Sequence, residues 1–351
     1  MTWLTWRQFR IQAITVYAGI LVLALVLSAT SRLVFSSNAD PATAIRDVTN
    51  AQAVVYFVGS GAVALLPAII GAFWGAPLVA RELEAGTHRL VWNQSVTRTR
   101  WLVVKLLFIG ATAFAAAALL ALAVTWWVAP IDRLAELVGD SGLPTRITPW
   151  LFDSRGIAPA GHAVFAFVLG VTMGVLVRRT LPAMALTLAI FIAVQVALPM
   201  WVRPHLVPPT DQTVAVGQVT QAESMSGDVF ALQSATPSGA WVHVNETLDP
   251  SGRAVAFLPS GTGGCTPPEL PPEGSMAGEP QSVPEKPAGP APKDDMQTCL
   301  SSLADLGYRQ HIVYHAPDRF WALQAAETAL FLVMSMGLAG LCIRWTRHRL
   351  S

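Results

Sequence analysis

The sequence predicts an all-α polytopic membrane protein with six transmembrane helices, a short charged helix and a small second domain. Hydrophobic residues make up 53% of the chain and charged residues only 13%, and the mean hydropathy is +0.47. Several runs of about 20 residues carry almost no charge, and each is long enough to cross roughly 30 Å of hydrocarbon. These observations exclude a soluble globular protein.

The predicted spans are residues 11–29, 53–78, 101–128, 158–177, 181–202 and 320–343. Prolines lie near several of their ends, where helix breakers are tolerated, and Pro67 is expected to kink the second span. Arginines precede the first span, as in a secretory signal. Its apolar core is longer than a usual signal core, so we interpret it as a retained helix.

The expected orientation follows from arginine and lysine. With a cytoplasmic N-terminus, the only acids of the inside segments are Glu82 and Glu84. Their cations are Arg7, Arg10, Arg81, Arg89, Arg98, Arg100, Lys105, Arg178, Arg179, Arg344, Arg347 and Arg349. The outside segments hold more acids than cations. The positive-inside rule therefore predicts that both termini are cytoplasmic.

Residues 78–101 form a charged connection between the second and third spans. Apolar and charged residues fall on opposite faces, which predicts an amphipathic helix at the membrane surface. Gly86 is expected to interrupt it, because glycine costs about 1 kcal/mol relative to alanine inside a helix. Ser95 or Thr97 is expected to cap the third span. The alternative is a solvated loop whose arginines only fix the topology.

Two further features concern the membrane part. Residues 1–10 are rich in tryptophan and suit a short interfacial helix before the first span, or else a frayed terminus. The second and fourth spans each contain a glycine pair at four-residue spacing, Gly71 with Gly75 and Gly170 with Gly174. This spacing lets helices approach closely, but it is also common by chance, so the partners of these glycines stay open.

The region between the fifth and sixth spans is too long for a simple connector. Alternating apolar residues at 241–245 and 253–258 predict a β-hairpin. Residues 260–293 are dense in Pro, Gly and Glu and are expected to be disordered. The expected organisation is a membrane domain at residues 1–202, a mixed α/β, partly disordered extracellular domain at 203–319, and a last span with its tail at 320–351.

Cys265 and Cys299 flank the predicted disordered insert and lie on the oxidising side of the membrane in this topology. A disulfide between them is therefore expected. Cys342 falls in the last span and is expected to be a packing residue.

The chain shows no energy source of its own. It lacks a phosphate-binding loop, an H-E-x-x-H motif and paired C-x-x-C motifs. His311 and His315 flank strand-like residues that would hold their rings more than about 10 Å apart, so no metal site is expected. Glu327 is the ionisable group expected at membrane depth. It either lines a pathway, for which Gln195 is a second candidate, or is hydrogen-bonded to neighbouring helices and water. Energy must then come from a partner.

The charged connection also resembles a known pattern. It contains Arg81-Glu82-Leu83-Glu84-Ala85-Gly86-Thr87, then Leu90, Ser95-Val96-Thr97-Arg98, Trp101 and Lys105. These residues are similar to the E-x-E-x-G-T, leucine, P-V-S-R, lysine pattern of permease subunits of type-2 ATP-binding-cassette exporters, in the form common among actinobacteria. Ser95 stands where the broader family often has proline. The span number, inside termini and large outside loop are similar as well.

The resemblance implies that residues 78–101 are a coupling helix that docks on a separate ATPase subunit. That subunit would bind ATP and magnesium, whereas this chain would hold no cofactor and catalyse no reaction. The residues expected at the coupling surface are Arg81, Glu82, Glu84, Gly86, Thr87 and Arg98, with Arg178 and Arg179 of the adjacent inside turn. A second permease, either another copy or a paralogue, would complete the unit in a bacterial plasma membrane. No nucleic acid partner is expected.

The resulting hypothesis is an exporter permease that moves an amphipathic or apolar substrate by alternating access, since the spans present mostly Ala, Leu and Val. The alternative is an ATPase-linked sensor or resistance complex that binds an extracellular ligand without transporting it. A membrane enzyme ranks last, because no acid, base, nucleophile or metal cluster gathers at one predicted depth.

Overall fold

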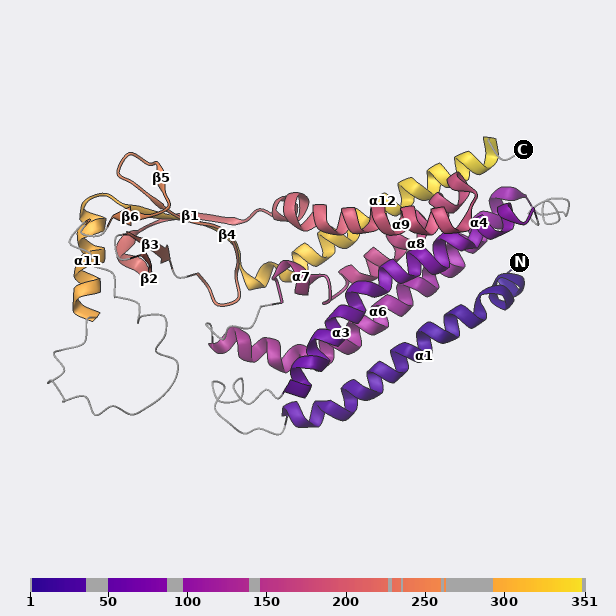
Figure 1. The fold of residues 1–351 in the computed structure, drawn as a ribbon, viewed down its shortest axis with the longest axis horizontal. Coiled ribbons are helices and arrows are strands. Elements are labelled where there is room, and N and C mark those ends of the chain that lie inside the picture. Colours follow the sequence, from indigo (N-terminus) through magenta and orange to yellow (C-terminus); the bar gives the residue numbers. More distant parts are fainter. Residues whose placement is uncertain are drawn as a thin grey trace. The chain divides into compact units, whose positions relative to one another are not determined.

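The computed structural model describes residues 2–35, 50–86, 97–138, 146–226, 229–234, 236–259, 262 and 293–348. The chain divides into two compact units (Figure 1). We call Met1–Pro208 with Pro317–Ser351 the membrane unit and Pro209–Ala316 the sheet unit. Residues 203–208 and 317–319, which the sequence analysis assigned to the extracellular domain, thus belong to the membrane unit.

Six helical runs in the described residues are long and apolar enough to cross a membrane, as predicted. They are Phe9–Thr30, Val54–Glu84, Thr99–Asp132, Ala158–Val177, Thr180–Leu206 and Pro317–His348. Each overlaps one predicted span. The chain is therefore a multi-pass membrane protein.

The helices of the membrane unit are α1 (Thr2–Phe35), α3 (Asn50–Ile69), α4 (Ala76–Glu84), α6 (Arg98–Val138), α7 (Pro149–Phe152), α8 (Ala158–Val177), α9 (Thr180–Ala197), α10 (Arg203–Leu206) and α12 (Phe320–His348). Two π-helices, η1 (Ile70–Gly75) and η2 (Leu198–Val202), join α3 to α4 and α9 to α10. Pro67 lies three residues before η1 and Pro199 lies within η2. Proline removes a backbone N–H donor, which accounts for a local change of helical hydrogen bonding.

Two sequence-based expectations need correction. The first helix is continuous from Thr2, so residues 2–10 extend the first span and do not form a separate interfacial helix. Phe9 anchors this part by an edge-to-face contact with Trp74, with ring centroids 4.7 Å apart. Likewise, α4 continues the second span through η1, and its Val79 is buried. The start of the charged connection is therefore the end of a spanning helix.

Helix α8 is the most buried of the six spans and packs against α3, η1, α4, α6, α9 and α12. The two glycine pairs explain its contact with η1. A Cβ atom on Gly170 would lie 2.2 Å from the carbonyl oxygen of Gly71, and one on Gly75 would lie 2.4 Å from that of Phe167. Backbone therefore touches backbone, and the two pairs are each other's contact partners.

One end of the membrane unit gathers most of its exposed cations. It holds α4, the turn between α8 and α9, the first turn of α1 and the last turn of α12 (Figure 1). We call it the charged end, and the opposite end, which holds α7 and the start of α8, the far end. At the charged end, Arg178 closes α8 with a left-handed φ of 58°, and its backbone N–H donates to Gly174 O at 3.1 Å.

The sheet unit contains two antiparallel sheets. Their strands are β1 (Thr210–Ala215), β2 (Val219–Ser226), β3 (Val229–Ser234), β4 (Trp241–Leu248), β5 (Ala254–Val255), β6 (Leu258–Pro259) and β7 (Arg309–His315). The strand orders are β1-β7-β4-β5 and β2-β3-β6. The predicted hairpin is confirmed as β4 and β5, and Asp249 stabilises its turn by accepting hydrogen bonds from the backbone of Ser251 and Arg253.

Helix α11 (Lys293–Asp305) contributes Leu300 and Leu303 to the core of the sheet unit, where they pack with Val216 and Leu232. This core gives the unit its own hydrophobic interior and confirms a small mixed α/β region. Cys299 is buried in the same core. Cys265 and most of the predicted disordered insert lie outside the described residues, so the disulfide stays a prediction.

Candidate functional site

At the charged end, a buried ion pair joins the second and third spans. Lys105 Nζ on α6 lies 2.6 Å from Glu82 Oε1 on α4, and the two side chains are 5% and 19% exposed. The ammonium group also lies 4.5 Å from the centroid of the Trp101 ring. A lysine that is this deeply buried needs such partners, because an unpaired ammonium group is strongly disfavoured away from water.

Glu84 makes a second link, from α4 to α9. Its Oε2 accepts hydrogen bonds from the backbone N–H of Thr180 at 3.1 Å and from the Thr180 hydroxyl at 2.7 Å. The carboxylate thus satisfies a backbone donor in the first turn of α9 and adds a negative charge where the helix dipole favours one. Both glutamates of the charged connection are therefore bonded within the chain.

The structure describes some of the other predicted coupling residues and the predicted cap, and leaves the rest out. Gly86 ends the helical run with a φ of +67°, as its predicted interruption requires. Thr97 accepts a hydrogen bond from Arg100 N at 3.3 Å, which confirms it as a cap of α6. Arg81, Arg178 and Arg179 are exposed. Thr87 lies outside the described residues, and the side chain of Arg98 is not described. Contact of any of these residues with an ATPase stays a prediction.

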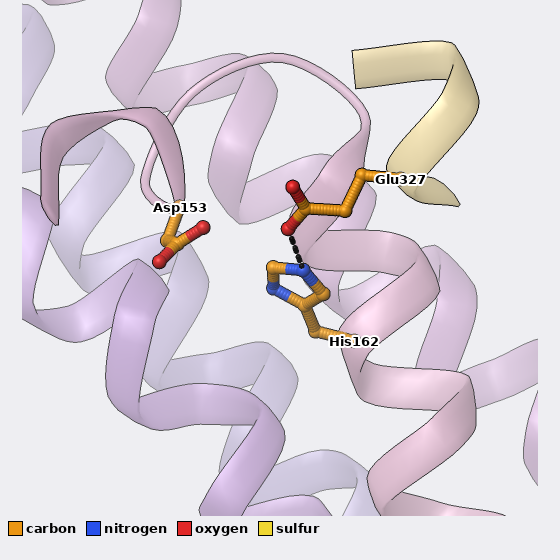
Figure 2. A group of neighbouring side chains, drawn as sticks. All are labelled: Asp153, His162 and Glu327. Atoms are coloured by element: carbon orange, nitrogen blue, oxygen red, sulfur yellow. Dashed lines mark hydrogen bonds and ion pairs between the residues drawn. The ribbon is translucent and has the colours of Figure 1, made fainter. Parts of the chain in front are cut away.

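At the far end, four side chains from four segments form a buried polar cluster. The far-end cluster consists of Asp153, His162, Arg203 and Glu327, and Figure 2 shows three of its members approaching one another. Arg203 and His162 are each 1% exposed and Glu327 is 0% exposed. Groups this polar are found in a protein interior only where they are hydrogen-bonded or paired.

Arg203 is the hub of the far-end cluster. Its Nε donates to Glu327 Oε2 at 2.7 Å, and its Nη2 donates to Glu327 Oε1 at 2.9 Å and to Asp153 Oδ1. Its Nη1 donates to the Pro149 carbonyl oxygen at 3.0 Å. His162 Nε2 lies 3.0 Å from Glu327 Oε1, the carboxylate oxygen that also accepts from Arg203 Nη2. The guanidinium thus binds α10 to α7, to the turn after α7 and to α12.

A neighbouring residue of α12 holds the start of α8. Gln324 Oε1 accepts hydrogen bonds from the backbone N–H of Ile157 at 3.0 Å and of Ala158 at 2.7 Å. Its Nε2 donates to the Phe152 carbonyl oxygen at 3.1 Å. The first amides of a helix have no partner within it, so this side chain acts as their cap. Gln324 and Glu327 lie one turn apart and together fix α12 on α8.

A second buried arginine lies close to the far-end cluster in sequence. Arg155 donates from Nη1 to Ser60 Oγ and Ser154 Oγ, and its Nε lies 3.5 Å from Asp132 Oδ2. Its guanidinium carbon also lies 5.3 Å from the centroid of the Tyr56 ring. This pair of opposite charges is balanced in itself and connects the turn before α8 to α3 and α6.

The cluster also contains donor groups of the kind that bind metals. Ligand atoms of Asp153, His162 and Glu327 lie within 4.8 Å of one another. However, Arg203 already donates to both carboxylates, so a divalent ion would have to displace a bound guanidinium. We therefore assign the positive charge of the site to Arg203.

Only Glu327 and Gln195 of this site were predicted from the sequence. Glu327 is hydrogen-bonded, in line with one of its two interpretations, and a role in a pathway stays a prediction for it and for Gln195. Gln195 Nε2 lies 3.5 Å from His162 Nδ1, at the edge of the cluster. His162 was missed although it lies inside a predicted span, where any ionisable residue is a signal. Arg203 was missed because it follows the last apolar residue of the fifth span.

An apolar groove of about 440 Å³ runs between α6, α8 and α12, with Leu106, Phe114, Val168 and Met336 among its walls. In the sheet unit, His311 of β7 lies between Glu246 on β4 and Asp211 on β1, at 3.1 and 3.0 Å. The hydrogen bond with Glu246, followed by that with Asp211, raises the pKa of His311 above its usual value.

Comparison with known families identifies the membrane part. Residues 3–203 match the family model described as ABC-2 membrane transporter related. No curated protein and no solved structure matches the chain. The matched region covers more than half of the sequence and contains the first four spans, most of the fifth, the links at the charged end and Arg203. The chain therefore belongs to the ABC-2 membrane transporter related family and is a permease component of that type.

Proposed function

We propose that the chain is the membrane-spanning subunit of an exporter driven by a separate ATPase subunit, which binds ATP and magnesium. The observation that carries this proposal is the pair of links from α4, Glu82 to Lys105 and Glu84 to Thr180. They join the end of the second span to the third and fifth spans. A displacement of the charged connection is therefore passed to several spans at once.

The links also refine the roles of the coupling residues. Glu82 and Glu84 act as anchors inside the membrane unit, while the exposed Arg81, Arg178 and Arg179 face the ATPase. Such a basic surface favours an acidic docking cleft, because complementary charge speeds and orients association. The positive-inside rule supports a cytoplasmic position for the charged end and both termini, in a chain that we propose lies in a bacterial plasma membrane.

The groove between α6, α8 and α12 supports an amphipathic or apolar substrate, since Ser335 is its one polar lining side chain among the described residues. A second permease, either a copy or a paralogue, completes the pathway. Large parts of α9 and α12 are exposed in the single chain, and these surfaces are available to lipid or to that second permease. Alternating access between two such subunits moves the substrate outward.

Purification of the tagged chain from its native host in a mild detergent tests the partner. A stoichiometric ATPase is expected, and it should be lost on combined Arg81→Glu and Arg179→Glu substitution. Arg309 on β7 is another exposed arginine, and Arg309→Glu is the control that should retain the ATPase. Recovery of the chain alone, or equal loss in the control, would contradict the proposal.

A second candidate function is ATPase-linked sensing of an extracellular ligand, and the separate hydrophobic core of the sheet unit favours it. Inside-out vesicles that contain the complex distinguish the two functions. An exporter accumulates an amphipathic fluorescent probe when ATP is added, whereas a sensor hydrolyses ATP without accumulation.

A further inference from the structure

The far-end cluster contains more carboxyl groups than guanidinium groups. Asp153 and Glu327 bring two carboxylates, and Arg203 brings one guanidinium. All three are buried or nearly so, and the net charge is negative by one unit. A buried charge without compensation is unfavourable by several kcal/mol, and such sites usually take up a proton instead. His162 lies 3.0 Å from Glu327 Oε1, and it is the basic side chain of the cluster that can take up a proton in the physiological pH range.

In the part of the chain that the structure describes, the surroundings of His162 supply no other compensating charge. Among the described residues, the charged side chains that face it are Glu327 from α12, Arg203 from α10 and Asp153 from the turn after α7. Helix α9 contributes the neutral Gln195, and α12 also contributes the ring of Phe331 at a centroid distance of 4.4 Å. The Arg155 and Asp132 pair nearby is balanced in itself.

We propose that the far-end cluster is a proton-binding site and that one proton, shared by His162 and Glu327, locks α12 onto α8. The protonated imidazole donates from Nε2 to Glu327. Its Nδ1–H points toward Gln195, whose amide oxygen accepts this bond once the amide is turned over, since its two ends are interchangeable in shape. With the proton bound, the cluster is electrically neutral and every member is paired.

Loss of the proton leaves a net negative charge in a closed interior. Separation of α12 from α8 lets water reach the carboxylates and removes this penalty. The closed arrangement therefore holds one proton more than the open one, and it weakens as pH rises. The lock is a property of the membrane unit alone. Its use in transport, where the far end opens to release substrate and proton together, rests on the proposed function.

Hydrogen exchange of two backbone amides reports directly on the lock. Ile157 N–H and Ala158 N–H donate to Gln324 Oε1 of α12, so they become exposed when α12 leaves α8. The purified full chain, in lipid nanodiscs without any ATPase, is labelled at about pH 6 and about pH 8, the range in which histidine titrates. Rates are corrected with an unfolded peptide of the same sequence. Release of one proton predicts up to a tenfold rise in opening per pH unit.

Variants separate the proton from the packing. Glu327→Gln keeps an acceptor for Arg203 and makes the cluster neutral without a proton, so protection should be high at both pH values. Asp153→Asn removes one negative charge at the other carboxylate of the cluster, and protection should likewise be high at both pH values. His162→Gln removes the imidazole proposed to hold the proton, so protection at about pH 6 should fall to the wild-type level at about pH 8. A purely structural role predicts loss of protection in all three variants.

His205→Gln is the matched control, because His205 is an exposed histidine in the same segment as Arg203 and lies outside the cluster. It should keep the wild-type pH dependence. Wild-type protection that does not change with pH, or a pH dependence that survives in Glu327→Gln and Asp153→Asn, would overturn the proposal. Neither result depends on an ATPase, so the exporter proposal stands or falls separately in the purification experiment.

Discussion

The two ends of the membrane unit use polar contacts in opposite ways. At the charged end the contacts are one-to-one, and Glu84 meets Thr180 at an exposed surface. At the far end four ionisable side chains share one closed interior. Exposed pairs are screened by water and contribute little, whereas removal of one partner from a buried set leaves an uncompensated charge. The exposed Glu84 contact at the charged end therefore tolerates change and motion, whereas the far end behaves as a unit.

The largest effect is expected from loss of the far-end hub. Arg203→Ala leaves Asp153 and Glu327 buried without their cation and should destabilise the membrane unit by about 3–5 kcal/mol or prevent its insertion. Arg179→Ala, at the exposed turn of the charged end, should change stability by no more than about 0.5 kcal/mol. Thermal unfolding in detergent and the yield in the membrane fraction measure both. Equal losses of stability in the two variants would contradict the difference between the two ends.

The next largest effect on stability is expected at the close contact between η1 of the second span and α8. Gly170→Ala places a methyl group 2.2 Å from the Gly71 carbonyl oxygen, so η1 and α8 must move apart, at a cost of about 1–3 kcal/mol or more. Gly337→Ala is the control, because nothing lies within 4 Å of its new methyl group. It should stabilise α12 slightly, by up to about 1 kcal/mol. Opposite shifts in Tm are expected, and equal shifts would contradict the close packing.

A charge exchange tests the link at the charged end. Glu82→Lys places a second ammonium group beside Lys105 and should lower the free energy of unfolding by about 2 kcal/mol, with a lower Tm. It should also reduce the ATP-driven accumulation of substrate. The double variant Glu82→Lys with Lys105→Glu restores an ion pair and should recover much of both. If stability recovers and transport does not, Glu82 contacts the ATPase directly, as the sequence analysis first implied.

The smallest effect is expected for a histidine outside the membrane unit. His311 lies between two exposed carboxylates, and its pKa is raised, first by the hydrogen bond with Glu246. Its ion pairs are therefore fully formed below the unfolded value of about 6.5, and their stabilisation is lost as pH rises through the higher folded value. Solvent screening limits the effect to less than about 1 kcal/mol.

Nuclear magnetic resonance titration of the His311 ring, with His311→Gln to assign the signal, measures this shift directly. A titration midpoint at or below the usual value for histidine would contradict the raised pKa. Local exchange of the β7 amides should slow slightly as pH falls, and this dependence should vanish in His311→Gln.

Local patterns in the sequence predicted what depends on neighbours along the chain. The six spans, the cap at Thr97 and the hairpin at Asp249 follow from apolar length, capping preference and turn chemistry. The far-end cluster depends instead on the three-dimensional meeting of four distant segments. Arg203 looked like the first residue of a loop, and only the π-helix that continues the fifth span carries it back into the interior. Glu327 and His162 each gave a local signal as ionisable residues inside predicted spans, and the sequence analysis used only that of Glu327.

The glycine contact between η1 and α8 also limits what sequence change can do. Backbone atoms of Gly71 and Gly170 already touch, so any side chain at either position forces the helices apart. A larger residue on one helix therefore cannot be compensated by a smaller one on the other, because glycine is already the smallest residue. Engineering of a different substrate range has to use other faces of α8, such as the groove that Val168 lines with α6 and α12.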